Sequence, residues 1–502
     1  MLITLVRREL LDNLMTFRFA ATTLITLLLV VANTAVLTED YEGRLASYYT
    51  ALETHRQQLQ ETKTYSAGKV VVDRPPNPLS IFNVGLDKRL GNQVEVSYAL
   101  VPTLWDAEMS GSDNPFLNIF NSIDIVFIFE VVLSLMALIF AYDALAGERE
   151  RGTLRLVLTH PLSRGHVLLA KYIGAMLCLL IPLMLSLLLS LILLTTTAPF
   201  SLGVPDFLRI GGIVLASLAY LSVFYLVGLL ISAMARRTST ALMISLFVWG
   251  FLVLVFPNMI LAMTHSSENL KSRADSAFNQ MKQLWDEFER ERKQFLANDA
   301  VPGEDWIFYE IPGVASSGNY HAAKLSTLSC FRRDFVHFTA LDDELESQVS
   351  HLQKYFSFLG SQTIDTAEQT WLVRGPALEH IFVQPANTER ILLKLSPVGV
   401  YDAATQAWAG TDLLGVRDFF DAARQYRQTV IDYFADNKTF GSRQWFSSDK
   451  SAADWSTLPQ FSFQRSDVAT NATRALPDSC LLLIINVALF MAIFLIFQKS
   501  EV

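Results

Sequence analysis

The chain has 502 residues, of which 51% are hydrophobic and 18% charged, and its formal net charge is −9. A soluble protein of this length carries about a quarter charged residues, so the composition excludes an ordinary soluble domain. The acidic balance argues against a nucleic-acid partner, because phosphate binding needs concentrated Lys and Arg. The three cysteines are too few for a disulfide framework.

The apolar residues collect in six runs, each close to the length of about 20 residues that crosses a bilayer. We expect six transmembrane helices, the first an uncleaved anchor rather than a signal peptide, because its apolar part exceeds a signal-peptide core and no small-x-small cleavage site follows. The predicted fold is an α-helical integral membrane protein whose outer domain is mainly helical α+β and built from two insertions. The runs are 19–37, 123–142, 167–194, 208–234, 241–263 and 476–497.

Basic residues in the short loops predict the orientation. They cluster in 1–18, in 143–166, between the fourth and fifth runs and after the sixth run. Because positive charges remain on the cytoplasmic side, both termini and the loop 143–166 are expected there. The same residues are suited to contact anionic membrane lipid. The long polar segments 38–122 and 264–475 then face outward.

The first outward segment begins with a helix that continues the first span. Tyr41, Leu45, Tyr48 and Leu52 step by four, three and four residues, as in a heptad stripe. The cluster "PPNP" then forbids helix. The alternating stretches "KVVVD" and "QVEVSYALV" predict two strands.

Polar residues within the spans are candidates for function. Glu130 lies in the second span, where a carboxylate costs about 2.5–3.5 kcal/mol on insertion scales. Three interpretations of Glu130 are open: it has a role in transport or gating, it lies in a water-filled crevice, or it pairs with a neighbouring span. Asn33 and Asn486 are expected to bond between spans. Pro182 and Pro257 are expected to kink their helices.

The loop 143–166 is longer and more charged than a turn between two spans requires. "GERERG" is followed by "TLRLVL", a pattern that predicts a short amphipathic helix at the inner membrane face. Ser163 is expected to cap the third span. A charged helix in this place suits docking of a partner protein; the alternative is an ordinary loop with topogenic arginines.

The second outward segment, 264–475, contains three stripes of apolar residues near heptad spacing. They begin at Leu270, Leu345 and Val416, and the first is expected to prolong the fifth span as a stalk. Intramolecular helix packing explains all three stripes. A dimeric coiled coil or a docking face is the alternative.

The motifs of common enzymes are missing. The chain has no HExxH, no CxxC, no GxSxG and no GxxxxGK[ST] loop. We find no constellation of nucleophile and base, so we assign no catalytic residue and no metal ligand. If the chain takes part in ATP-driven work, the ATPase, with its ATP and Mg, is on another chain.

The stretch "YDALAGERERGTLRLVLTHPLSRGHVLLAKYIGA" resembles the segment between the second and third spans of type-2 ATP-binding-cassette (ABC) permeases. "LVRRELLDNLMTFRF" resembles the amphipathic helix with which that family begins along the inner leaflet. "RPPNPLSIFNVGLDKRLG" and "LSPVGVYDAATQAWAGTDLLGVRDFF" resemble a bacterial subgroup with large periplasmic insertions after spans one and five.

The resemblance implies a permease in the bacterial inner membrane with two copies of a cytoplasmic ABC ATPase and a second permease, identical or paralogous. It implies that a coupling helix is seated in the ATPase. The residues carried over are Glu148, Arg149, Glu150, Arg151, Gly152, Thr153, Leu154 and Arg155. The family normally has a short re-entrant element near span five, where this chain has a domain of about two hundred residues.

Three functions remain open at this point. The complex exports, extracts or flips a substrate toward the periplasm. Alternatively, it uses ATP to move its periplasmic domains against envelope partners, with nothing crossing the membrane. A receptor or scaffold whose outer domain binds a ligand is the third interpretation. The sequence alone does not reveal a substrate.

Overall fold

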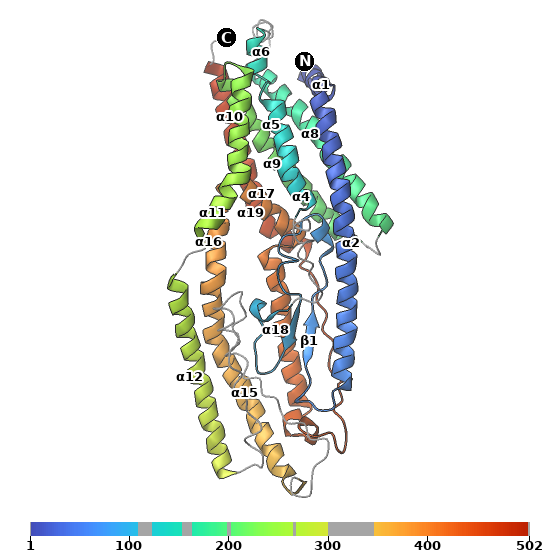
Figure 1. The fold of residues 1–502 in the computed structure, drawn as a ribbon, viewed down its shortest axis with the longest axis vertical. Coiled ribbons are helices and arrows are strands. Elements are labelled where there is room, and N and C mark those ends of the chain that lie inside the picture. Colours follow the sequence, from blue (N-terminus) through green and yellow to red (C-terminus); the bar gives the residue numbers. More distant parts are fainter. Residues whose placement is uncertain are drawn as a thin grey trace.

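The computed structural model describes residues 2–108, 123–152, 163–197, 202–264, 268–299 and 346–499. The molecule is elongated, with a bundle of apolar helices in one half and a mixed domain in the other (Figure 1). Both termini and the short helix α6 (Ala146–Glu150) lie at the free end of the bundle. We call this end the terminal end of the molecule.

In the part of the chain that the structure describes, six helices are long and apolar enough to cross a membrane, which confirms the predicted α-helical membrane fold. A separate helix, α1 (Leu2–Leu14), precedes them, and the second span is a composite of α4, the π-helical turn η3 and α5. The spans are formed by α2 (Phe17–Glu61), α4 (Ile125–Ile128) with η3 (Phe129–Leu133) and α5 (Ser134–Ala141), α8 (Arg164–Thr197), α9 (Val204–Met234), α10 (Thr238–Gly250) with η4 (Phe251–Val255) and α11 (Phe256–Thr264), and α19 (Val468–Lys499).

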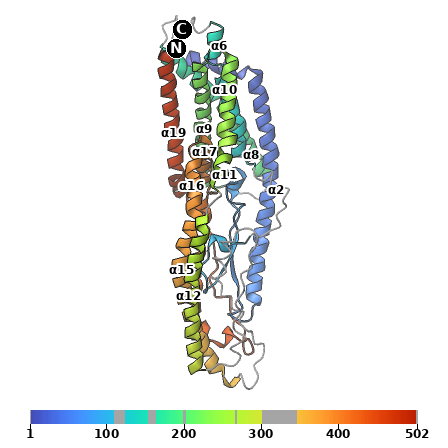
Figure 2. The same cartoon turned by 60° about the vertical axis from the view of Figure 1, so that its left-hand side comes forward.

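Helix α9 lies at the centre of the bundle. It packs against α19, α5, α10 and the short helix α17 (Pro397–Ala409), and it is buried over most of its length. In Figure 2, α9 and α17 lie beside α19. By contrast, α2, α10 and α19 keep exposed apolar faces, as helices at the rim of a membrane bundle do.

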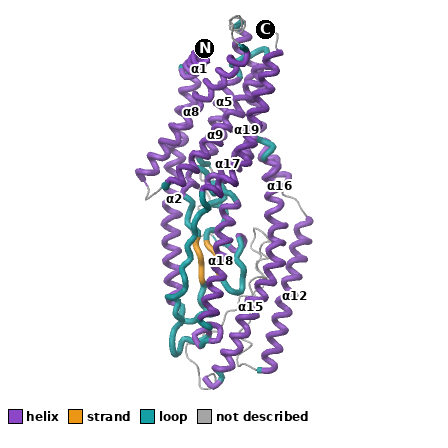
Figure 3. The backbone as a smooth tube through the Cα atoms, turned by 180° about the vertical axis from the view of Figure 1, so that it is seen from behind, coloured by secondary structure: helices purple, strands orange, loops and turns teal. Residues whose placement is uncertain are grey.

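The half of the molecule beyond the apolar bundle is built from both insertions; we call it the outward domain, after the side to which the sequence analysis predicts it to face. α2 continues without a break to Glu61, as the heptad stripe predicted, and the predicted strands pair antiparallel with Val70 opposite Val96. The two strands are β1 (Val70–Asp73) and β2 (Gln93–Val96). The other elements of this domain are helical (Figure 3). They are η1 (Pro78–Ile81), η2 (Leu104–Asp106), α12 (Glu268–Asn298), α15 (Val349–Leu378), α18 (Leu413–Asp436), η7 (Thr439–Gly441) and η8 (Arg443–Trp445).

One aromatic-rich core joins the two insertions. Val72 and Val94 of the sheet share it with Trp285 of α12, Phe356 of α15 and Phe420 of α18. The stripes of the second insertion therefore pack within this chain, as the sequence analysis preferred. Only α12 departs from the expected stalk, because α11 ends at Thr264 and α12 lies beside α15 (Figures 1 and 2).

The second insertion returns to the membrane bundle before its end. The long helix α15 continues through η6 (Glu379–Val383) and α16 (Gln384–Leu393), and α17 runs back after a short turn. In that turn the Ser396 hydroxyl donates to the Leu252 carbonyl oxygen at 3.0 Å, halfway along the fifth span. The turn is tight, because a Cβ atom at Gly399 would collide with the Leu393 backbone. The sequence analysis did not foresee this hairpin and assigned all of 264–475 to the outer side.

Among the described residues, three helical turns are π-helical, and a proline accounts for two of them. Pro257 lies two residues after η4 and Pro385 two residues after η6. Proline has no N–H and clashes with the carbonyl four residues earlier, and a π turn widens the helix at that point. No proline follows η3, which contains Glu130.

Candidate functional site

The charged loop after the second span folds against the terminal end of the bundle. Helix α6 is short because Gly152, with φ of +73°, turns the chain out of the helix. The start of α6 is fixed to α9, since the backbone N–H groups of Leu145 and Ala146 both donate to the Ser232 hydroxyl, at 3.1 and 2.9 Å. The loop therefore begins on a buried support.

Two charged side chains of α6 bind the helix ends on either side of the turn between α9 and α10. The Arg149 guanidinium donates to the carbonyl oxygens of Ala233 and Ala235, at 3.2 and 3.0 Å. The Glu150 carboxylate accepts the backbone N–H and the hydroxyl of Thr238, at 3.0 and 2.8 Å. Because a cation suits a helix C-terminus and an anion an N-terminus, both pairs agree with the helix dipoles.

Glu148 is held by a lysine of the third span. The Lys171 ammonium lies 2.7 Å from the Glu148 carboxylate and 3.0 Å from the Glu9 carboxylate of α1. Its side chain is only 4% exposed, whereas each carboxylate keeps about a quarter of its surface. Three helices, α1, α6 and α8, thus meet at one buried cation; Lys171 belongs to the stretch that resembles ABC permeases, but the sequence analysis assigned it no role.

The predicted coupling residues therefore divide into two groups. Glu148 and Arg149 bind other helices of this chain, and Glu150 does so while remaining exposed. Arg151 and Gly152 are exposed as well. Thr153, Leu154 and Arg155 lie outside the described residues.

The end of the loop is attached to the sixth span. The Ser163 hydroxyl accepts the backbone N–H of His166 at 3.3 Å, so the predicted cap is present. The Arg164 guanidinium donates to the carbonyl oxygens of Phe497 and Gln498, at 2.8 and 3.1 Å. Arg164 thereby caps the C-terminus of α19 as Arg149 caps that of α9.

Within the bundle, Glu130 is 6% exposed, and its carboxyl group lies close to that of Asp402 in α17. The acidic neighbour of Glu130 is thus a residue of the returning hairpin and not of another span. The role of Glu130 in transport or gating stays a prediction.

Aromatic and hydroxyl side chains surround this acid pair. The rings of Tyr220 in α9 and Tyr401 in α17 stack at 4.3 Å between centroids. The Tyr220 hydroxyl donates to the Glu130 carbonyl oxygen at 3.1 Å, and the Tyr401 and Ser217 hydroxyls lie 2.8 Å apart. The contacts fix the hairpin to spans two and four.

The two predicted asparagines differ. The Asn486 side chain donates to the Ala219 carbonyl oxygen of α9 at 2.8 Å, a bond between spans. The Nδ2 atom of Asn33 has no hydrogen-bond partner among the described residues. Its neighbour Thr34 makes the contact between spans one and three, with Ser190 at 3.0 Å.

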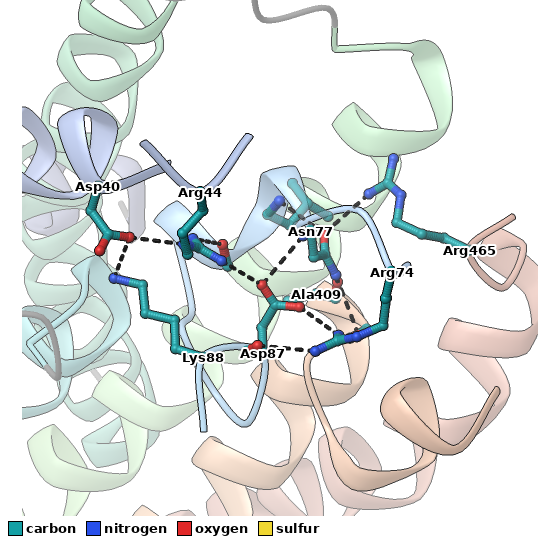
Figure 4. Close-up of polar contacts among 11 residues, drawn as sticks. Asp40, Arg44, Arg74, Asn77, Asp87, Lys88, Ala409 and Arg465 are labelled. Atoms are coloured by element: carbon teal, nitrogen blue, oxygen red, sulfur yellow. Dashed lines mark hydrogen bonds and ion pairs between the residues drawn. The ribbon is translucent and has the colours of Figure 1, made fainter. Parts of the chain in front are cut away.

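At the opposite end of the bundle, a polar network joins the spans to the outward domain (Figure 4). Its centre is Asp87, whose carboxylate accepts Arg74 at 2.8 Å and Arg44 of α2 at 2.9 Å. Arg44 and Lys88 both bind Asp40, at 2.9 and 2.6 Å. Arg74 and Asp87 are almost fully buried.

The same network reaches the fourth and sixth spans. Asn77 donates to the Ala409 carbonyl oxygen at the end of α17, and it accepts Arg465 at 3.1 Å. Arg465 and Arg209 of α9 both bind Asp206, at 3.2 and 3.0 Å. The first insertion, the hairpin and the outer end of α9 are therefore tied together; this network, which we call the junction, was not found from the sequence.

These features define a class: a multi-pass helical membrane subunit with a charged loop seated across its helix ends at one side and a rigidly attached domain at the other. A family model for ABC-2 family transporter proteins matches residues 3–296, more than half of the chain. The chain therefore belongs to the ABC-2 family of transporter proteins. A second model, for a domain of unknown function (DUF3526), matches residues 384–464, which include α16, α17 and α18.

Two curated relatives carry the name "Probable ABC transporter permease protein NosY". The chain is 35% identical to the one from Stutzerimonas stutzeri over 138 residues, 27% of this chain and 50% of the relative. It is 36% identical to the one from Pseudomonas aeruginosa over 134 residues, 26% of this chain and 48% of the relative. The chain thus spans about half the length of the curated relatives it matches.

Proposed function

We propose that this chain is the membrane subunit of an ATP-driven complex in the bacterial inner membrane. Two copies of a separate ABC ATPase bind the segment 143–166 from the cytoplasm. A second permease, identical or paralogous, forms a dimer with this chain. ATP and Mg belong to the ATPase. The family and the permease names of the relatives support the class of the complex.

One observation carries the proposal: α9 is fastened at both ends. At the terminal end, Ser232 binds the start of α6. At the other end, Arg209 is bound into the junction through Asp206 and Asn471. Ser232 comes 23 positions after Arg209, which is about 35 Å along a helix. A buried helix of that length connects the loop to the outward domain without an intervening turn.

This arrangement explains how force applied at the loop reaches the outer side. When the ATPases close, α6 is displaced. Since Arg149 and Ser232 hold α6 to the end of α9, α9 follows as a rigid rod, and the junction turns with it. Rigid-body motion of packed helices is a common way for membrane and allosteric proteins to transmit a local change.

The result of that motion is movement of a substrate toward the periplasm by export, extraction or flipping. A second candidate is mechanical: the outward domain itself moves against an envelope partner and nothing crosses the membrane. The buried junction favours this candidate, because Arg74 and Asp87 leave the domain no flexible linker at that point. The receptor interpretation has no such observation in its favour.

Photo-crosslinking tests the ATPase contact directly. A crosslinking amino acid replaces Arg151, which is exposed at the terminal end, and in a control chain it replaces Lys450, which is exposed in the outward domain. We expect Arg151, and not Lys450, to capture an ABC ATPase when the chain is expressed in its own host. An ATPase captured at Lys450, or at neither position while the chain is folded, would overturn the proposal.

A second experiment separates transport from mechanical action. The purified complex is reconstituted into liposomes with a fluorescent lipid in one leaflet, and lipid redistribution is followed with ATP and with a non-hydrolysable analogue. ATP-dependent redistribution supports lipid flipping. Labels on the outward domain that move with ATP, without redistribution of lipid, support the mechanical candidate.

A further inference from the structure

Helix α1 lies against the third span more closely than an ordinary surface helix. A Cβ atom on Gly174 of α8 would stand 3.0 Å from the Cβ atom of Glu9 and 3.3 Å from the Leu10 backbone nitrogen. Contacts this tight are uncommon for a real Cβ atom, so Gly174 lets the backbones of α1 and α8 approach closely.

The exposed side of α1 carries apolar and basic side chains together. Ile3 and Leu11 are 84% and 44% exposed, Arg7 and Arg8 are exposed as well, and Met15 and Phe17 follow the helix with 78% and 86%. Amphipathic helices of this composition lie in the plane of the membrane, with their apolar side chains among the lipid chains and their basic side chains at the headgroups. α1 therefore has one side on the third span and the other available to the inner leaflet.

Lys171 connects this helix to α6. Its ammonium bridges Glu9 and Glu148 at 3.0 and 2.7 Å, and it is the only cation in this pair of contacts. Without it the partly buried Glu9 and Glu148 carboxylates would lose the cation that they share, and the like charges would repel each other. The Lys171 backbone is itself held, because the Tyr225 hydroxyl of α9 donates to its carbonyl oxygen at 3.2 Å.

We infer that Lys171 is a positioning residue that joins α1 to α6, so that the segment gripped by the ATPase and the helix on the inner leaflet move as one body. The inference rests on the proposed function, since it requires a force on α6. Its consequence is a second output of the ATP cycle: besides turning α9, the motion displaces an amphipathic helix in the lipid of the inner leaflet.

Separating α1 from α6 would break an ion pair between Lys171 and one of the two carboxylates. Breaking a partly buried ion pair costs more free energy than breaking an exposed one. Another ion pair of α1, between Arg8 and Asp12 at 3.7 Å, is exposed on both sides and makes no contact between helices. It provides a matched control on the same helix.

The experiment measures the distance between α1 and α6 in the complete complex with its ATPase in lipid nanodiscs. Spin labels are placed on cysteines at Arg7 and Arg151, both exposed, after Cys330 and Cys480 have been replaced by serine. With Glu9, Glu148 and Lys171 unaltered, we expect a narrow distribution of the distance between the two labels, and we expect it to be the same without nucleotide and after nucleotide trapping. With Lys171→Met we expect the distribution to broaden and to change on trapping.

The ATPase rate provides the second readout. Lys171→Met is expected to weaken the effect of this chain on the ATPase rate at least about fivefold, at the lower end of typical coupling between sites. Lys171→Arg, which keeps the charge and can reach both carboxylates, is expected to restore both readouts. Asp12→Asn is expected to change neither.

Further variants keep the inference testable if Lys171→Met does not fold. Glu9→Gln weakens only the α1 arm, and Gly174→Val pushes α1 away while it leaves the triad charges intact; both are expected to broaden the distance distribution. Unchanged distances and rates in the folded variants would overturn the inference. Failure of the proposed function is recognised separately, by loss of the Arg151 crosslink to the ATPase in the unaltered chain.

Discussion

Asp87→Ala is the sharpest test of the junction. The carboxylate is 5% exposed and binds Arg74, itself 6% exposed, as well as Arg44 and the Asn77 backbone N–H. Its removal leaves the Arg74 cation buried without a counter-charge, and breaking a buried pair in this way costs about 3–5 kcal/mol. For a domain of a few hundred residues we expect a loss of about 10 °C in the unfolding temperature.

The assay is thermal unfolding of the detergent-purified chain, combined with amide hydrogen exchange over residues 74–87 and 409–415. Exchange in both segments should accelerate together, because Asn77 ties them through the Ala409 carbonyl oxygen. Glu346→Ala is the matched control: Glu346 binds Arg443 and Lys450 on an exposed surface, where a pair contributes about 1 kcal/mol or less. If Asp87→Ala shifts the unfolding temperature no more than Glu346→Ala, the junction does not hold the domain to the spans.

Three further predictions concern the hairpin and the sheet. Glu130→Gln should preserve stability, because an amide can hydrogen-bond the neighbouring Asp402 carboxyl group, whereas Glu130→Leu should cost about 1–3 kcal/mol because it offers Asp402 no such bond. Thermal unfolding of both variants is the measurement, and equal losses of stability in the two variants would contradict the pairing. Gly212→Leu should displace α17, since any Cβ atom there meets the Trp408 ring; increased accessibility of the α17 backbone to hydrogen exchange is the measurement, and unchanged protection would count against the packing. Burial raises the pKa of Asp73 above its ordinary value, so its contribution to stability is greatest below the unfolded-state pKa and is lost as pH rises through the folded-state pKa; Asp73→Asn should flatten this part of the pH dependence, and an unaltered dependence would refute it.

Local sequence patterns were sufficient for elements whose partners lie close in the chain. The stripe that starts at Val416 folds as α18, and the alternation around Val72 and Val94 gives the predicted strand pair. Such patterns report which face of an element is buried. They do not report what covers it, and so the alternatives of coiled coil and internal packing could be separated only by the structure.

The polar contacts could not be predicted, because each joins residues far apart in the sequence. Glu130 lies in the second span and Asp402 in the second insertion, and Lys171 lies between residues 9 and 148. One signal was present for the hairpin: residues 391–401 are apolar apart from a lysine and a serine. A run of 10–14 apolar residues is too short to span a bilayer and is typical of re-entrant or buried segments.

Two arginines at the terminal end serve both the charge pattern that predicts orientation and the capping of helix ends. Arg149 and Arg164 belong to the loop whose positive charge predicted the cytoplasmic side, and each of them caps the C-terminus of a different span. The carbonyl groups at a helix C-terminus carry partial negative charge and lack intrahelical donors, so a guanidinium both satisfies and neutralises them. Because α9 and α19 end at the same side as the loop, one short charged segment can hold both ends. A force on that segment is then applied to two spans at once, and through α9 to the junction, which is the mechanical requirement that the proposed coupling places on this chain.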